Sequence, residues 1–131
     1  MPFARLTLIP APPPEMAQRL CAGLADLIAR DLGKRGDLTS VLVETPGAYQ
    51  WTIGANDCKS AAHLEVCVTF GTNSAEEKQT FIANAMALLR RELQGLGDAT
   101  YVIIKDLPGG DWGYGGRTQA DRAASMTQAP V

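Results

Sequence analysis

The chain has 131 residues, a length at which a single hydrophobic core commonly forms. Apolar residues make up 46% and charged residues 20%, and the longest apolar stretches are the size of a strand, which argues against a disordered chain and against a membrane span. The formal net charge of −2 comes with scattered Lys and Arg rather than a basic stripe, so we expect no nucleic-acid partner.

The first half of the chain predicts a strand, a helix and a second strand. Phe3–Ile9 alternates apolar and polar residues, as a half-buried strand does. After a proline-rich turn, apolar residues recur at spacings of three to four as far as Gly33, which predicts a helix. Leu38–Glu44 predicts the second strand, and a turn leads from it to the short segment Gln50–Ile53.

The second half repeats this order. Leu64–Phe70 alternates as a strand, and Ser74-x-x-Glu77 is a capping box that predicts the start of a helix. Thr100–Ile104 predicts the next strand. A glycine-rich stretch, Asp111-Trp112-Gly113-Tyr114-Gly115-Gly116, follows it and predicts a hairpin.

These elements predict an α/β (α+β) fold made of two β-α-β pseudo-repeats, at about residues 2–54 and 63–116, within one domain spanning 1–116. Right-handed crossovers would give a four-stranded mixed sheet with two helices on one face, plus short hairpin strands. The other face would lack helices, so we expect the chain to associate with copies of itself. Residues 117–131 are expected to form a polar tail that is loose or lies across a neighbour.

Cysteine and histidine offer little for metal or disulfide chemistry. The three cysteines, Cys21, Cys58 and Cys67, are odd in number and lack a CxxC spacing, which argues against a disulfide framework and a zinc site. With His63 as the single histidine, a catalytic triad or a multi-histidine metal site is not expected. We expect no metal and no cofactor.

The amino terminus carries the residue with the most distinctive chemistry. Met1-Pro2 is a favoured context for removal of the initiator methionine, which would leave a free secondary amine at the start of a strand. An N-terminal amine has an ordinary pKa near 8, and burial or a nearby cation lowers it toward the value that suits a general base at neutral pH. No basic region or long apolar core of a signal peptide precedes the first strand, so we expect a cytoplasmic protein.

The order of elements and the glycine-rich hairpin together resemble a known family. Leu64 to Gly116 resembles a 4-oxalocrotonate tautomerase subunit in strand order, spacing and the closing aromatic-Gly-x-Gly-Gly, with Trp112 at the aromatic position. Pro2 to Gly54 resembles a second, degenerate copy that closes on Trp51-Thr52-Ile53-Gly54. The chain is thus similar to the double-length subunits of the tautomerase superfamily, such as macrophage migration inhibitory factor, D-dopachrome tautomerase and malonate semialdehyde decarboxylase.

The resemblance implies a set of site residues and a homotrimer. Pro2 matches the catalytic proline, and Leu32-Gly33-Lys34 resembles the stretch that ends in a substrate-binding lysine. Tyr101 falls where the inhibitory-factor family places a pocket tyrosine from the adjacent subunit, and Trp112 and Tyr114 would form an apolar wall from that same neighbour. The implied activity is keto–enol tautomerisation of small 2-oxo acids of the phenylpyruvate type.

Departures from the family keep other functions open. Arginines that other branches use to bind carboxylates are missing: Pro12 stands at that place in the first half and Gly71-Thr72-Asn73 in the second. The alternatives are a decarboxylase, hydratase or dehalogenase of the same superfamily, and a non-catalytic binding or scaffold trimer. With Met1 attached, Pro2 is an amide and cannot act as a base. Lys34 could equally be a solvated residue that complements a helix dipole.

Overall fold

A four-stranded mixed sheet forms the centre of the molecule. The computed structural model describes residues 1–128, with side chains described as far as Ser125. The strand order is β2-β1-β5-β6, in which both outer pairs are parallel and the central β1–β5 pair is antiparallel. The strands are β1 (Phe3–Ile9), β2 (Ser40–Glu44), β5 (Ala61–Thr69) and β6 (Tyr101–Leu107). Each half of the chain supplies one parallel pair joined by a helix, so the two predicted pseudo-repeats and the mixed sheet are confirmed.

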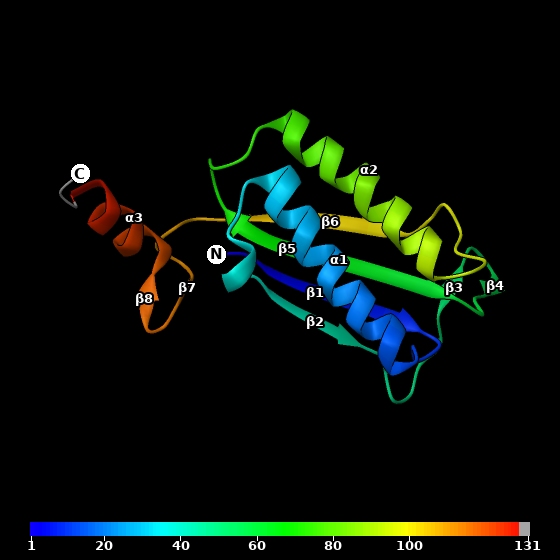
Figure 1. The fold of residues 1–131 in the computed structure, drawn as a ribbon. Coiled ribbons are helices and arrows are strands. Elements are labelled where there is room, and N and C mark those ends of the chain that lie inside the picture. The colour runs from blue at the N-terminus through cyan, green and yellow to red at the C-terminus, as the bar shows by residue number, and fades with distance from the viewer. Residues whose placement is uncertain (129–131) are drawn as a thin grey trace.

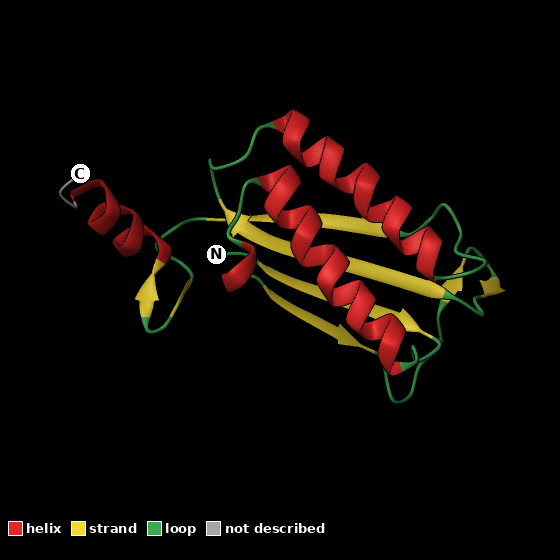
Figure 2. Ribbon diagram, viewed as in Figure 1, coloured by secondary structure: helices red, strands yellow, loops and turns green. Residues whose placement is uncertain are grey.

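Two helices, α1 (Pro14–Leu32) and α2 (Ala75–Glu92), cover one face of this sheet (Figures 1 and 2). Helix α1 begins with a proline in its first turn, where no amide partner is needed, and ends at Gly33, whose φ of 67° is left-handed. Helix α2 has the predicted capping box: the Glu77 amide donates to Ser74 Oγ at 3.1 Å, and the Ser74 amide donates to Glu77 Oε1 at 2.8 Å. Both predicted helices, the end of α1 at Gly33 and the start of α2 at Ser74 are confirmed.

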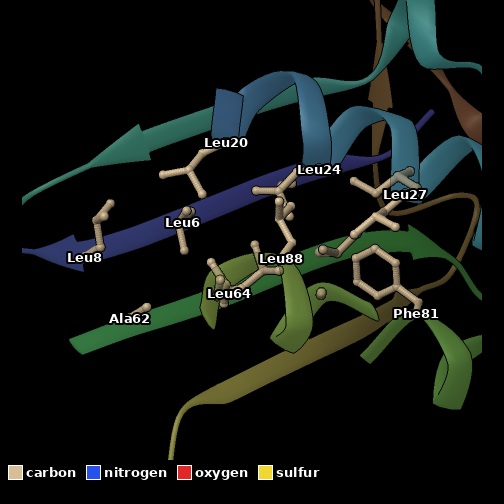
Figure 3. Close-up of a cluster of buried hydrophobic side chains, with 14 of the residues drawn as sticks. Leu6, Leu8, Leu20, Leu24, Leu27, Ala62, Leu64, Phe81 and Leu88 are labelled. Carbon is tan, nitrogen blue, oxygen red and sulfur yellow. The ribbon is translucent and has the colours of Figure 1, made fainter. Parts of the chain in front are cut away.

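The core lies between these helices and the inward face of the sheet. Leu6 of β1 is opposite Leu64 of β5, and both are fully buried. Phe81 of α2 is also fully buried, and burial of a side chain of this size contributes roughly 1.5–3 kcal/mol. Figure 3 shows side chains of both helices and both central strands meeting in this layer, among them Leu20, Leu24, Leu27, Leu88, Leu8 and Ala62.

The helix-free face of the sheet carries charges as well as apolar side chains. Arg5 Nε lies 2.6 Å from Glu44 Oε1, and Lys105 Nζ lies 2.6 Å from Glu65 Oε1. Arg5 and Glu65 are register partners, so the two ion pairs form a row of alternating sign across all four strands. Exposed pairs of this kind contribute little to stability, but they mean that this face is less apolar than the sequence suggested.

Short hairpins lie at opposite ends of the sheet (Figure 1). One is β3 (Thr52–Ile53) with β4 (Asn56–Asp57), and the other is β7 (Gly113–Tyr114) with β8 (Arg117–Thr118). A short 3₁₀ helix, η1 (Gly36–Leu38), takes up the start of the expected second strand, so β2 begins at Ser40.

The segment expected to be a polar tail is structured as far as Gln128. After β8 it forms helix α3 (Gln119–Gln128), and residues 129–131 of the expected tail lie outside the described residues. The arm formed by β7, β8 and α3 extends beyond the end of the sheet at which the amino terminus lies (Figure 1). No helix within residues 1–128 is long and apolar enough to span a membrane.

Candidate active site

The amino terminus opens into a cavity of about 460 Å³. Pro2 is buried at the start of β1, and its carbonyl accepts a hydrogen bond from the Ser40 amide at 3.3 Å, so the β1–β2 pairing extends to this residue. The cavity lies between the start of β1, Leu38 of η1, Cys67 of β5 and the C-terminal arm, and its walls are mostly apolar. A volume of this size suits a small organic ligand.

Trp112 and Tyr114 of the C-terminal arm also line this cavity. The Trp112 indole Nε1 donates to Thr69 Oγ1 at 3.2 Å, which ties the arm to the end of β5. We expected both aromatic residues to reach the site from a neighbouring subunit, whereas here they line the same cavity as Pro2 of their own chain. The glycine between them is required by the hairpin: a Cβ on Gly113 would lie 1.9 Å from the Arg117 carbonyl oxygen.

Helix α3 contributes two residues that the sequence analysis missed. Gln119 lines the cavity, and its Nε2 donates to the carbonyl oxygen of Met1 at 3.1 Å. Arg122 follows one turn later on the same side of the helix. Its Nη2 donates to the Tyr114 carbonyl oxygen at 3.0 Å, and its guanidinium lies 3.8 Å from the centre of the Tyr114 ring. The Nε of Arg122 is buried and has no hydrogen-bond partner among the residues whose side chains the structure describes.

The surroundings of the amino terminus favour a neutral amine. Burial, followed by the Lys34 ammonium and the Arg122 guanidinium, lowers the pKa of the N-terminal amine from its ordinary value of 8.0. That amine belongs to Met1 here. The Pro2 nitrogen, one residue further along the chain and itself buried, is held in an amide as long as Met1 is attached.

Lys34 is fixed beside the site by the end of α1. Because Gly33 turns the chain in a left-handed conformation, the Lys34 amide lies 3.5 Å from the Ile28 carbonyl oxygen. The Lys34 ammonium donates to Thr72 Oγ1 at 2.7 Å. Burial lowers the pKa of Lys34, with Glu77 and Asp106 opposing the shift. Lys34 is therefore a constrained cation near the amino terminus rather than a freely solvated one.

Tyr101 lies far from this cavity within its own chain. It begins β6 and pairs with His63, near the start of β5, whereas Cys67 at the cavity lies near the end of that strand. Its side chain is 66% exposed. The structure thus brings Pro2, Trp112 and Tyr114 together, places Lys34 close by, and leaves Tyr101 at the opposite end of the sheet.

Within the described part of the chain, no cluster of three or more His, Cys, Asp or Glu side chains has the arrangement of a metal site. The cavity is lined by the amino terminus, the Gln119 amide and aromatic side chains, and the cations Lys34 and Arg122 lie close enough to act on the terminal amine. This arrangement can bind an anion and transfer a proton.

Comparisons with solved structures identify the fold. Native fused 4-OT superposes with a TM-score of 0.81 at 20% identity, covering 92% of this chain and 98% of that one. A macrophage migration inhibitory factor-like protein from Entamoeba histolytica gives 0.76 at 17% identity, covering 89% and 97%. Pt0534, solved after inactivation by 2-oxo-3-pentynoate, gives 0.79 at 15% identity, covering 92% and 98%. The resemblance drawn from the sequence is therefore confirmed at the level of the fold.

Two further structures with this fold are described as an asymmetric and a symmetric trimer of fused 4-OT. The sequence itself matches no family model and no curated protein sequence.

Proposed function

We propose that this chain is a tautomerase-superfamily enzyme that interconverts the keto and enol forms of small 2-oxo acids, with the Pro2 amine as its general base. The observation that carries the proposal is the position of Pro2: it is buried at a mostly apolar cavity, in surroundings that lower the pKa of an amine. A general base is most effective when its pKa is close to the working pH. The shared fold with fused 4-OT and with inhibitory-factor-like proteins supports the same reading.

The proposed reaction needs one proton carrier and one group that stabilises the developing charge. The Pro2 nitrogen takes a proton from the carbon next to the carbonyl. The electrons of that C–H bond form the carbon–carbon double bond of the enol, and the carbonyl oxygen gains negative charge. Lys34 stabilises this oxygen, and the prolyl ammonium returns its proton to it. Trp112 and Tyr114 hold the apolar part of the substrate and exclude water.

The proposed assembly is a homotrimer. Fused 4-OT, which has the same fold, is described as a trimer. The helix-free face of the sheet also retains exposed apolar side chains, Phe3, Leu42 and Tyr101, that an assembly would cover. In such a trimer Tyr101 would complete the cavity of a neighbouring subunit.

Met1 decides between this function and a non-catalytic one. Met1 lines the cavity and blocks the Pro2 nitrogen, so a chain that keeps it would be suited to binding rather than to proton transfer. The experiment measures the intact mass of the purified protein and its rate of phenylpyruvate tautomerisation, followed by the ultraviolet absorbance of the enol. We expect a mass that lacks Met1 and a rate above the buffer-catalysed one. A protein without Met1 and without this rate enhancement would contradict the proposal.

A further inference from the structure

The arginines that bind carboxylates in related enzymes are missing from their usual places, and the structure shows what occupies one of those places. Thr72 Oγ1 accepts the hydrogen bond from Lys34 at 2.7 Å, and the Asn73 side-chain Nδ2 donates to the Leu32 carbonyl oxygen at 2.8 Å. These residues hold the end of α1 and its lysine. A guanidinium for the substrate carboxylate would have to come from another element.

Helix α3 supplies such a guanidinium. Gln119 and Arg122 are separated by one helical turn. Gln119 donates to the Met1 carbonyl oxygen, whereas Arg122 contacts Tyr114 of the cavity wall and is close enough to the N-terminal amine to lower its pKa. The start of α3 is anchored to the loop before the hairpin, because the Gln119 amide donates to the Trp112 carbonyl and the Ala120 amide to the Gly109 carbonyl, each at 2.9 Å. The helix is thereby fixed against the cavity.

Arg122 has unused hydrogen-bonding capacity. Arg122 has five N–H groups, and within the described residues one of them, on Nη2, makes a hydrogen bond, to the Tyr114 carbonyl oxygen. Its Nε is buried and has no partner among the side chains described as far as Ser125. Within residues 1–128 the structure gives Arg122 no ion pair with a carboxylate, and the neighbouring Asp121 pairs with Arg117 at 2.7 Å. A buried donor without an acceptor is costly, which favours a ligand that provides one.

The Met1 carbonyl oxygen marks where an acceptor atom fits. It occupies the position 3.1 Å from Gln119 Nε2, and it would leave together with Met1. Removal of Met1 would therefore expose the Pro2 amine and free the Gln119 donor in a single step. An oxygen of the ligand can then take the place of the lost carbonyl.

We propose that Arg122, assisted by Gln119, binds the carboxylate of the substrate in the Pro2 cavity. This inference rests on the function proposed above and assigns a separate role to each cation. Arg122 and Gln119 bind the substrate carboxylate, and Lys34 stabilises the oxygen that becomes the enolate. The mostly apolar cavity of about 460 Å³ takes the remainder of the molecule. The substrate class is thus a monocarboxylate with an apolar group, rather than a dicarboxylate.

Binding of an unreactive ligand tests this inference apart from catalysis. Isothermal titration calorimetry would measure the affinity of 3-phenylpropionate and of its neutral amide for protein whose intact mass lacks Met1, the methionine being removed enzymatically where it has been retained. Arg122→Gln should weaken binding of the acid about ten- to hundredfold and leave binding of the amide unchanged, because a hydrogen-bonded charge pair is lost. Arg122→Lys should fall between the two, since it keeps the charge without the bidentate geometry.

Arg117→Gln is the matched control, because Arg117 belongs to the same arm but is paired with Asp121 and donates to Ser125 Oγ at 2.7 Å. It should bind the acid as the wild type does. Gln119→Glu, which leaves Arg122 in place, should also weaken binding of the acid by charge repulsion. Far-UV circular dichroism of each variant checks that the helices are retained.

Equal affinity of the wild type and Arg122→Gln for the acid, or no preference of the wild type for the acid over the amide, would overturn the inference. If Arg122→Gln binds 3-phenylpropionate more weakly than the wild type does, but the wild type does not tautomerise phenylpyruvate, the inference stands and the proposed function fails. If the wild type turns over phenylpyruvate and Arg122→Gln does so with an unchanged KM, the proposed function stands and the inference about Arg122 fails.

Discussion

Gln119 Nε2 and the carbonyl oxygen of Met1 are joined by a hydrogen bond of 3.1 Å, although the two residues lie near opposite ends of the chain. The bond connects helix α3 to the residue whose removal would create the proposed catalytic amine. The C-terminal arm is therefore part of the candidate site. The arm also carries the aromatic wall, since Trp112 and Tyr114 line the cavity beside Gln119.

The pH dependence of kcat/KM should report the pKa of the Pro2 amine. A base acts in its unprotonated form, so kcat/KM should rise with pH. Burial, Lys34 and Arg122 lower the pKa of the Met1 amine, and we expect the same surroundings to lower the pKa of the Pro2 amine once Met1 is removed. Removal of a cation raises the pKa of the amine, and Arg122→Gln should therefore move the midpoint to higher pH. Arg117→Gln should leave it in place. A midpoint that moves down, or not at all, in Arg122→Gln would contradict this account of the amine.

Lys34→Ala should act on chemistry more than on binding. If Lys34 stabilises the enolate oxygen, kcat should fall about ten- to hundredfold for both phenylpyruvate and its ethyl ester, because both carry that oxygen. Steady-state kinetics with the two substrates measure the effect. Lys59→Ala, an exposed lysine of the loop before β5, is the control and should behave as the wild type. A rise in KM confined to the acid would instead assign the carboxylate to Lys34.

Gly113→Ala should open the β7–β8 hairpin and leave the core folded. A Cβ at this position would lie 1.9 Å from the Arg117 carbonyl oxygen, and backbone at that distance has to move. We expect loss of tautomerase activity and a red-shifted Trp112 emission, measured in a Trp51→Phe background, with most of the far-UV circular dichroism retained. Gly110→Ala in the same loop is the control, because a Cβ there meets nothing within 4 Å. Wild-type activity of Gly113→Ala would show that the hairpin is dispensable.

Tyr101 tests the proposed trimer. Within one chain it lies at the end of the sheet away from the cavity, so it can act at a site only through a neighbouring subunit. Inactive Pro2→Ala chains mixed with inactive Tyr101→Ala chains should regain activity, since some mixed trimers would combine an intact Pro2 with an intact Tyr101 of the neighbour. Native mass spectrometry verifies the mixed trimers. No recovery in verified mixed trimers would place Tyr101 outside the site.

The sheet and its two covering helices were predictable because their signals are local and repeated. Alternation in Phe3–Ile9 and Leu64–Phe70 gave strands, and the Ser74-x-x-Glu77 box and Gly33 marked helix ends that the structure confirms. Helix α3 was missed although Thr118-x-x-Asp121 has the spacing of a helix start, and the Asp121 amide does donate to Thr118 Oγ1 at 3.0 Å. With few apolar residues after it, that spacing had no periodic pattern to support it.

The candidate site was predictable only in part. The resemblance pointed to Pro2, Trp112 and Tyr114, which the structure brings to one cavity. Which chain supplies the aromatic wall depends on the path of the arm relative to β1, and no pattern in the sequence encodes that path. Arg122 and Gln119 were not predicted as site residues. Their importance comes from tertiary contacts of α3, which join Gln119 to Met1 and Arg122 to Tyr114.

The most direct test of the central claim compares wild type with Pro2→Ala, both shown by intact mass to lack Met1. Alanine keeps a primary amine at the terminus but loses the ring, which makes the proline amine secondary and fixes the direction of the nitrogen lone pair. General-base catalysis is worth about 10²–10⁴-fold, so kcat for phenylpyruvate should fall by about 10²-fold or more while the melting temperature stays close to that of the wild type. Equal kcat in the two proteins would contradict the claim that the Pro2 amine is the base.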